Sequence, residues 1–238
     1  MSTADRILRK LKSCKQILLG KGHASFSQYG EDIIILSLLD RLNISDISYL
    51  DIGANDPVLG SNTYSFYLRG FSGVLIEPNQ ALVSRINKLR PKDTCLNIGI
   101  GLDNTSAATY YMFEEQYNAL NTFSKEEAEL RKMQGIPFKK TVQVPLKNVN
   151  EIITTHFNQA PTIVTIDVEG LDEQIIRSID FQAHKPLVLC VETVTYSKTS
   201  IAEKKKSLIA YLLDRGYFIY ADTYANTIFC DEKVIHKV

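Results

Sequence analysis

Short apolar runs alternate with amphipathic segments along most of the chain. Five runs are apolar on both faces and are predicted to be buried strands, at residues 47–52, 73–77, 94–100, 162–167 and 187–192. Periodic apolar positions between them predict helices over residues 31–42, 61–69, 81–90, 149–157 and 172–179. Strands of this kind, alternating with helices, are typical of a parallel sheet that is covered on both sides. The pattern therefore predicts a doubly wound α/β fold with right-handed crossovers.

The end of the chain follows a different pattern. A basic amphipathic helix is predicted over residues 201–215, and two strands follow at residues 217–221 and 227–230. The residues that join these strands, 222–226, are too few for a parallel crossover, so the strands are expected to pair antiparallel. The expected fold is a Rossmann-like sheet that is mostly parallel and ends in a C-terminal antiparallel hairpin.

The middle of the chain is less regular, and residues 105–145 are interpreted as an insertion in a single domain of residues 26–238. Ser124 followed by Glu127 forms a capping box, which predicts a helix running to about Met133. Weaker strands are expected at residues 107–113 and 141–146. Four aromatic residues gather in this insertion, namely Tyr110, Tyr111, Phe113 and Tyr117. They fit either the core of a strand or a surface that stacks on a sugar ring and sets substrate specificity.

Residues 1–25 are interpreted as a basic helical extension. The first 22 positions contain six Lys and Arg residues and one acidic residue, Asp5. Such a helix fits against the domain with one face, or rests on an anionic membrane surface through residues 5–20.

Composition narrows the classes of function. The 238 residues carry 27 Lys and Arg and 27 Asp and Glu, so there is no overall positive charge to attract nucleic acid. A hydrophobic content of 45% argues against intrinsic disorder. The four cysteines form no CxxC pair, no apolar run approaches the ~20 residues that span a bilayer, and no signal peptide is recognisable. A soluble, cytoplasmic protein is expected, and its oligomeric state is left open.

Carboxylates end four of the five predicted buried strands, and these are Asp51, Glu77, Asp167 and Glu192. In doubly wound sheets, ligands bind at the carboxyl ends of the strands, near the point where the strand order switches. These four side chains are therefore expected to share one ligand site.

The loop after the first strand has features of a nucleotide-type site. Gly53 permits a tight turn and a close approach of the ligand, and Ser61 or Asn62 can cap the next helix. The loop lacks the GxGxxG pattern, and Asp51 and Asp56 would repel a pyrophosphate. A ligand with positive charge or hydroxyl groups fits the loop better.

The next two strands extend this site. Glu77 lies 26 residues after Asp51, where an acid can accept hydrogen bonds from ribose hydroxyls. Asn97 lies at the end of the third strand, where an adenine would be placed.

Six blocks, in this order, resemble the FkbM family of S-adenosylmethionine-dependent methyltransferases. They are SQYGED (27–32), LDIGANDP (50–57), GSNTY (60–64), LIEPN (75–79), IDVEG (166–170) and GY (216–217). The resemblance extends from about residue 26 to residue 231. It implies a seven-stranded methyltransferase sheet, S-adenosylmethionine as the cofactor, and O-methylation of sugars, polysaccharides or polyketide-type metabolites.

The resemblance also implies roles for residues. The 51–60 loop is expected to hold the methionine part of the cofactor, and Glu77 the ribose. The block at 27–32 is expected to fold over the cofactor as a lid, although a plain helix cap is an alternative. The residues expected to bind the cofactor are Gln28, Tyr29, Asp51, Gly53, Asn55, Ser61, Asn62, Thr63, Glu77, Asn79, Asn97 and Asp167.

Asp167, Glu169 and Glu192 are the catalytic candidates, and three hypotheses remain open for them. If the backbone stays extended, period two places Asp167 and Glu169 on one side. Either of them could then take the hydroxyl proton as general base. Alternatively, Asp167, Glu169 and Glu192 could bind a divalent cation such as Mg²⁺, which lowers the pKa of the hydroxyl. As a third alternative, they only orient the hydroxyls of the acceptor.

Two other functions compete with methyl transfer to a small-molecule or glycan acceptor. A nicotinamide-dependent oxidoreductase would share the sheet, but the missing GxGxxG pattern and the terminal hairpin argue against it. A non-catalytic binding or scaffolding subunit would have no physical need for Asp51, Gly53 and Glu77.

Overall fold

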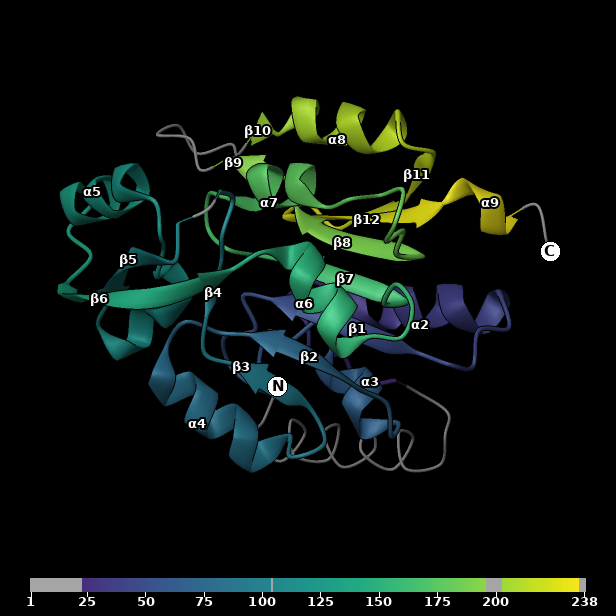
Figure 1. Cartoon of the computed structure of the whole chain (residues 1–238), viewed down its shortest axis with the longest axis horizontal. Helices are drawn as coiled ribbons and strands as arrows, with labels where there is room; N and C mark the ends of the chain where they lie inside the picture. The colour runs from purple at the N-terminus through teal and green to yellow at the C-terminus, as the bar shows by residue number, and fades with distance from the viewer. Residues whose placement is uncertain (1–22, 104, 196–202, 236–238) are drawn as a thin grey trace, which may run out of the picture.

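A seven-stranded sheet runs through the centre of the computed structural model, which describes residues 23–103, 105–195 and 203–235 (Figure 1). The strand order is β11-β12-β8-β7-β1-β2-β3. The strands are β1 (Ser48–Ile52), β2 (Ser72–Ile76), β3 (Thr94–Leu96), β7 (Ile163–Ile166), β8 (Val188–Glu192), β11 (Tyr217–Asp222) and β12 (Asn226–Asp231). Neighbours pair parallel except at β12, which is antiparallel to both β8 and β11. The predicted sheet and its terminal hairpin are confirmed.

Helices cover both faces of this sheet. They are α2 (Glu31–Arg41), α3 (Tyr64–Leu68), α4 (Gln80–Leu89), α6 (Val149–His156), α7 (Asp172–Ser178), α8 (Lys206–Leu213) and the short α9 (Glu232–Ile235). Two apolar cores result, one beneath α6, α7 and α8 and the other beneath α2, α3 and α4. Leu50 and Ile52 of β1 enter the first core and Tyr49 enters the second, which follows from the two-residue period of a strand. Burial on both sides explains the continuous apolar runs in the sequence.

The predicted strand at residues 94–100 is wrong in its second half. β3 ends at Leu96, and β4 (Gly99–Ile100) joins another sheet with β6 (Phe138–Lys147) and β5 (Ala107–Phe113), in the order β4-β6-β5. The side chain of Asn97 donates to the carbonyl oxygens of Glu77 and Pro78, at 3.0 and 2.9 Å, beyond the last paired residues of β2 and β3. The chain therefore changes partner within one apolar run, and hydrophobicity alone does not record that change.

Residues 105–145, interpreted as an insertion, build most of this second sheet and its helices. β5 pairs antiparallel with β6, and the turn η1 (Glu115–Leu120) and helix α5 (Lys125–Met133) lie between them. Ser124 caps α5, since its Oγ accepts a hydrogen bond from the Glu127 amide at 3.1 Å. Tyr110, Met112 and Val144 form a small separate core. Tyr110 also lines a cavity at the ends of the central strands, so the strand-core interpretation is confirmed for it and the sugar-stacking interpretation stays a prediction.

Several predicted boundaries move. The helix predicted over residues 61–69 is the shorter α3, and the described part of the helix predicted over 201–215 is α8. Just before α8, β10 (Glu203–Lys204) pairs with β9 (Val194–Thr195). The basic extension, with its membrane-surface alternative at residues 5–20, lies almost entirely outside the described residues. Within the described ranges, no helix is long and apolar enough to cross a membrane.

Candidate active site

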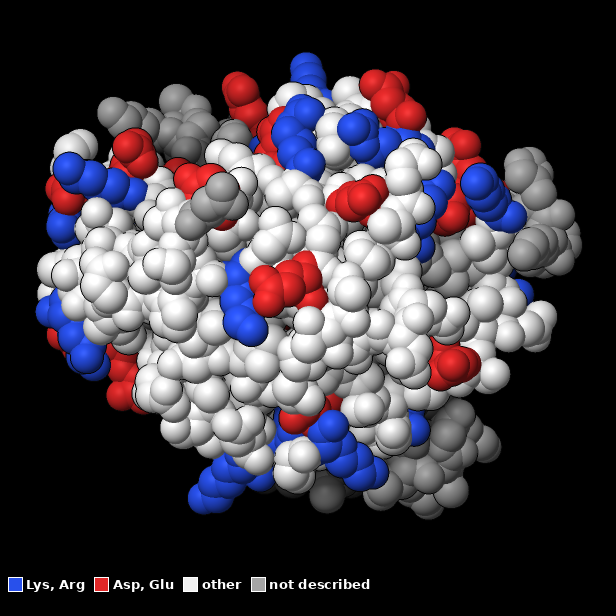
Figure 2. Space-filling view, in the orientation of Figure 1, with Lys and Arg blue, Asp and Glu red and all other residues white. Residues whose placement is uncertain are grey.

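A cavity of about 840 Å³ opens where β1, β2, β7 and β8 end. This is the switch point of the sheet, because β1 leads to β2 on one side and is flanked by β7 on the other. Most of the predicted site residues line the cavity, namely Gln28, Tyr29, Asp51, Gly53, Asn55, Ser61, Asn62, Glu77, Asp167, Glu169 and Glu192. The sheet thus brings together all four carboxylates predicted at strand ends. The face drawn in Figure 2 carries charges of both signs without a large area of one sign.

Three predicted residues do not line this cavity, and each supports its wall from behind. Thr63 is fully buried and donates its hydroxyl to Asp51 Oδ2 at 2.5 Å. Asn79 caps α4 with its side-chain oxygen and donates its backbone amide to Glu77 Oε1 at 2.7 Å. Asn97 fixes the backbone carbonyls of residues 77 and 78, as described above.

Asp51 and Gly53 shape the floor of the cavity. The second carboxylate oxygen of Asp51 accepts from the hydroxyl of Thr165 at 2.7 Å, so both oxygens have partners in the protein. Gly53 has a φ of +89°, and a Cβ at this position would clash with the carbonyl oxygen of Asp167. Glycine is therefore required both by the turn and by the close contact between the ends of β1 and β7.

Glu77 is a buried hydrogen-bond acceptor with lone pairs that no group of the described residues uses. Its Oε2 accepts from the Asn55 amide at 2.8 Å and its Oε1 from the Asn79 amide at 2.7 Å. Burial raises the pKa of Glu77 to about 7; the two backbone donors oppose this shift, and the charge of Asp51 adds to it. Each carboxylate oxygen has a second lone pair, so Glu77 can still accept hydrogen bonds from a ligand.

Asn62 adds an unused acceptor. Asn62 is one of the residues that line the cavity, and its side-chain oxygen is buried and has no hydrogen-bond partner among the described residues. A buried acceptor without a partner costs about 1–3 kcal/mol, so a ligand that donates to this oxygen would be favoured.

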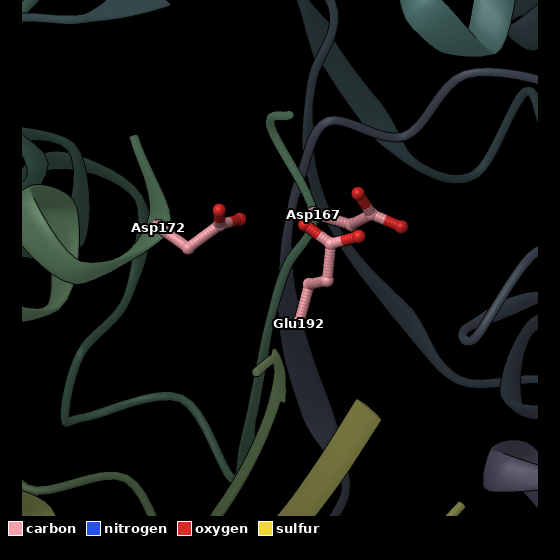
Figure 3. A group of neighbouring side chains, drawn as sticks. All are labelled: Asp167, Asp172 and Glu192. Carbon is pink, nitrogen blue, oxygen red and sulfur yellow. The ribbon is translucent and has the colours of Figure 1, made fainter. Parts of the chain in front are cut away.

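A second set of acids lies across the cavity from Glu77, at the ends of β7 and β8 and the start of α7. Figure 3 shows Asp167, Asp172 and Glu192, and one carboxylate oxygen from each lies within 4.8 Å of the others. The ammonium of Lys205 lies 2.9 Å from Asp172 Oδ2 and 3.7 Å from Glu192 Oε2. The acids therefore have a cation of the protein itself beside them.

This crowding changes the pKa values of the acids. Burial, together with the charges of Asp172 and Glu169, raises the pKa of Glu192 to about 8, while Lys205 opposes the shift. Burial and the neighbouring carboxylates of Glu192 and Glu169 raise the pKa of Asp167 well above its ordinary value. Both acids therefore hold their protons to a higher pH than an exposed carboxyl group does.

Glu169 lies differently from its predicted position. β7 ends at Ile166, and the backbone turns away from the extended region, with a φ of +57° at Glu169 and +115° at Gly170. The carboxylate of Glu169 accepts from Arg131 of α5 at 2.7 Å. The period-two alignment of Asp167 with Glu169 is therefore wrong, and the structure groups Asp172 with Asp167 and Glu192 instead.

Asp172 and Lys205 were missed by sequence reasoning. Asp172 was interpreted only as the first residue of a helix, and Lys205 as one charge of a basic helix. Asp172 also accepts from the backbone amide of Val168 at 3.0 Å and so fixes the loop that carries Asp167. The sequence signal that could have indicated Asp172 is its position five residues after Asp167, on the other side of Gly170.

The segment before α2 lies against the cavity. Gln28 and Tyr29 line it, and Ser27 forms a parallel bridge with Gly60 of the 51–60 loop. Asp32 is fully buried, is not among the residues that line the cavity, and accepts a hydrogen bond from the hydroxyl of Ser27 at 2.9 Å. The acids of the SQYGED block thus anchor the segment, while its middle residues face the ligand space.

The model of the Methyltransferase FkbM domain matches residues 51–219, more than half of the chain, and this range includes all four strand-end carboxylates. The chain belongs to the FkbM methyltransferase family. The family predicted from the sequence blocks is thereby confirmed, and the block at 27–32 lies before the matched range. Among curated proteins, nothing matches this FkbM methyltransferase.

Three solved methyltransferase structures of low sequence identity are similar to the FkbM chain. A TehB-like SAM-dependent methyltransferase from Corynebacterium glutamicum is 9% identical, with a TM-score of 0.42 over 97% of this chain and 100% of that chain. An O-methyltransferase from Bacillus cereus in complex with SAH is 11% identical, with a TM-score of 0.40 over 96% and 90% of the two chains. Magnesium protoporphyrin IX methyltransferase from Synechocystis PCC 6803 is 12% identical, with a TM-score of 0.41 over 90% and 86%.

Proposed function

We propose that this FkbM domain transfers the methyl group of S-adenosylmethionine to a hydroxyl oxygen of a sugar, polysaccharide or polyketide-type metabolite. The observation that carries the proposal is the presence of two separate carboxylate sets in one cavity. Glu77 and Asp51 belong to the ends of β2 and β1, whereas Asp167 and Glu192 belong to the ends of β7 and β8. The first set can accept hydrogen bonds from the hydroxyl groups of a nucleoside. The second set can accept the proton that the acceptor hydroxyl loses during methyl transfer.

The cavity fits the cofactor in size and chemistry. Its volume of about 840 Å³ lies within the range of about 300–1,000 Å³ that is typical of small-molecule sites. Glu77 can accept hydrogen bonds from the ribose hydroxyls, and the unpaired oxygen of Asn62 can accept one from the amino group of the methionine part. When bound, S-adenosylmethionine supplies an electrophilic methyl group on a positively charged sulfur, a charge that the surrounding carboxylates favour.

Asp167 is the residue that we assign as general base. The acceptor oxygen forms the new bond to the methyl carbon, the sulfur keeps the electron pair of the broken bond, and the hydroxyl proton passes to Asp167. Glu169 is less suited to this role because its carboxylate is already bonded to Arg131. The neighbouring carboxylate of Glu192 raises the pKa of Asp167, so the ionised form of Asp167 is a stronger base than an exposed carboxylate.

Lys205 places a positive charge beside Glu192, one of the three acids for which the sequence left Mg²⁺ open. An ammonium 2.9 Å from Asp172 and 3.7 Å from Glu192 neutralises two of the three acids that could hold a metal. The proposed reaction therefore contains no metal-bound step, and methyl transfer should persist after exhaustive EDTA treatment.

The second sheet contributes to the wall of the cavity. Residues 105–145 place Tyr110 and the turn η1 on the cavity wall, so we assign them to acceptor selection.

Cys190 and Cys230 are buried free thiols, which supports a reducing compartment such as the cytoplasm. Nucleic acid is not proposed as an acceptor, because Lys and Arg only balance Asp and Glu over the chain.

Thermal unfolding with S-adenosylhomocysteine tests the proposed cofactor directly. A ligand at about 100 times its Kd stabilises the native state by about 2.7 kcal/mol. For a domain of this size the expected rise in Tm is about 5–10 °C. NAD⁺ is the control and should produce no shift. A shift with NAD⁺ alone would favour an oxidoreductase, and no shift with either ligand would favour a non-catalytic subunit.

The affinity for S-adenosylhomocysteine is expected to rise between pH 6 and pH 8. Ribose hydroxyls donate to the ionised form of Glu77. Because the pKa of Glu77 is about 7, most protein molecules carry protonated Glu77 at pH 6 and must lose that proton before they bind the ribose. The Kd is expected to fall about fivefold to tenfold between pH 6 and pH 8. Isothermal titration of the parent protein and of Glu77→Gln provides the measurement. The variant should bind more weakly and with a flat pH profile; an equally steep profile would show that another group titrates.

A further inference from the structure

Three large apolar side chains surround the mouth of the cavity and are unusually exposed. Tyr29, Leu59 and Tyr224 are 52%, 75% and 56% exposed, and all three line the cavity. They come from three separate segments: the one before α2, the loop after β1, and the turn of the β11–β12 hairpin. Apolar side chains gathered at the rim of a pocket indicate a surface that binds a partner or ligand.

Tyr224 is held in a conformation that costs free energy. Its φ of +78° lies in the left-handed region, which bulky residues rarely adopt. The turn is fixed on both sides, because the Tyr224 amide donates to Asp222 at 2.8 Å and the Thr223 amide donates to the Asn226 carbonyl at 2.9 Å. These hydrogen bonds hold the aromatic ring of Tyr224 at the rim of the cavity.

One buried carboxylate joins the two segments that carry the tyrosines. Glu31 Oε1 accepts from the hydroxyl of Thr223 at 2.6 Å and from the side chain of Asn226 at 3.0 Å. Its other oxygen, Oε2, accepts from the backbone amide of Tyr29 at 2.9 Å. Glu31 is fully buried, and its carboxylate links the Tyr29 segment to the hairpin turn.

We infer that Tyr29 and Tyr224 form two aromatic walls of the acceptor site, that Glu31 sets their spacing, and that the acceptor is a pyranose ring. A pyranose presents apolar C–H groups on its faces and hydroxyls on its edge. The tyrosine rings suit the faces, and the carboxylates of Asp167 and Glu192 in the same cavity suit the edge. This inference rests on the proposed function, and it assigns Tyr29 to the acceptor rather than to the cofactor.

Saturation-transfer NMR on the full chain, saturated with S-adenosylhomocysteine, tests the inference. The probes are methyl α- and β-glycosides of hexoses and 6-deoxyhexoses, mixed with the parent protein, Tyr224→Ala, Tyr224→Phe and Ile219→Ala. Ile219 is a matched control, since it lies on the same hairpin, is 42% exposed, and does not line the cavity. Ring C–H protons of at least one glycoside should receive saturation from the parent protein. The signal should fall about tenfold or more in Tyr224→Ala and persist in Tyr224→Phe and Ile219→Ala.

Glu31→Gln provides a second, independent variant. Gln offers one acceptor oxygen and one donor group in place of two acceptors, so it cannot accept from both Tyr29 and the hairpin. The glycoside signal should fall while binding of S-adenosylhomocysteine is retained. The inference is overturned if no glycoside receives saturation from the cofactor-bound parent protein, or if Tyr224→Ala gives the parent signal. Failure of the parent protein to bind S-adenosylhomocysteine would instead overturn the proposed function.

Discussion

Replacing Asp167 by Asn is expected to reduce kcat for methyl transfer by about 10²–10⁴, the usual contribution of a general base. The amide has nearly the same shape as the carboxylate but cannot take up the proton of the acceptor hydroxyl. Asp167 directly follows the strand β7 and lines the cavity together with Glu192. The measurement is S-adenosylhomocysteine released from S-adenosylmethionine with a glycoside acceptor, together with the Kd of S-adenosylhomocysteine.

Glu169→Gln is the matched control for this variant. The side chain of Glu169 also lines the cavity, but its carboxylate is hydrogen-bonded to Arg131, and the Gln oxygen can still accept that bond. Glu169→Gln should therefore change kcat less than tenfold. The pH profile gives a further check. Because burial and neighbouring charges raise the pKa of Asp167 and bring that of Glu192 to about 8, the base is protonated in acid, and kcat of the parent should rise with pH. Parent-like turnover in Asp167→Asn would leave the acids with the orienting role alone, and a larger loss in Glu169→Gln would move the base to that residue.

The parts of the fold that the sequence predicts well depend on burial on both faces. β1, β2, β7 and β8 are apolar at nearly every position because helices cover the sheet on both sides, and a run of that kind is visible without coordinates. Their last residues are equally visible, which is why Asp51 and Glu77 could be placed in the site. The partner change after Leu96 was not visible, because residues on both sides of it are apolar while the paired strand changes from β2 to β6.

The same distinction applies within the site. The position of Glu169 depends on a left-handed backbone at the end of β7, which a two-residue period does not foresee. Asp172 and Lys205 meet Asp167 and Glu192 only after α7 and α8 have packed on the sheet. Arg90 is the strongest case, because a basic residue at the end of a helix is normally solvated, yet this one is completely buried. The sequence thus predicts which strands reach the site, and tertiary packing decides which side chains complete it.

Arg90→Met is expected to lower the free energy of unfolding by about 3–5 kcal/mol, the usual effect of breaking a buried ion pair on one side. The guanidinium donates to Asp93 at 2.7 Å, and neither side chain is exposed to solvent. Met fills similar space but leaves the carboxylate of Asp93 buried without its cation. Urea unfolding measures this loss. Arg85→Met is the control, because Arg85 is 54% exposed in its pair with Asp56 and should contribute at most about 1 kcal/mol.

The same substitution should weaken cofactor binding, since Arg90 also holds the loop that leads to the cavity. Its two terminal nitrogens donate to Ser61 at 3.2 Å and to Thr63 at 2.9 Å, and Thr63 in turn holds Asp51. An increase of about tenfold in the Kd of S-adenosylhomocysteine is expected from the loss of these charged hydrogen bonds. The double variant with Asp93→Asn separates the two effects: removing the second charge should restore much of the stability but leave Ser61 and Thr63 without their donor. Recovery of both stability and affinity would mean that Arg90 acts only as a counter-ion, and a stability loss below about 1 kcal/mol in Arg90→Met would contradict the buried pair itself.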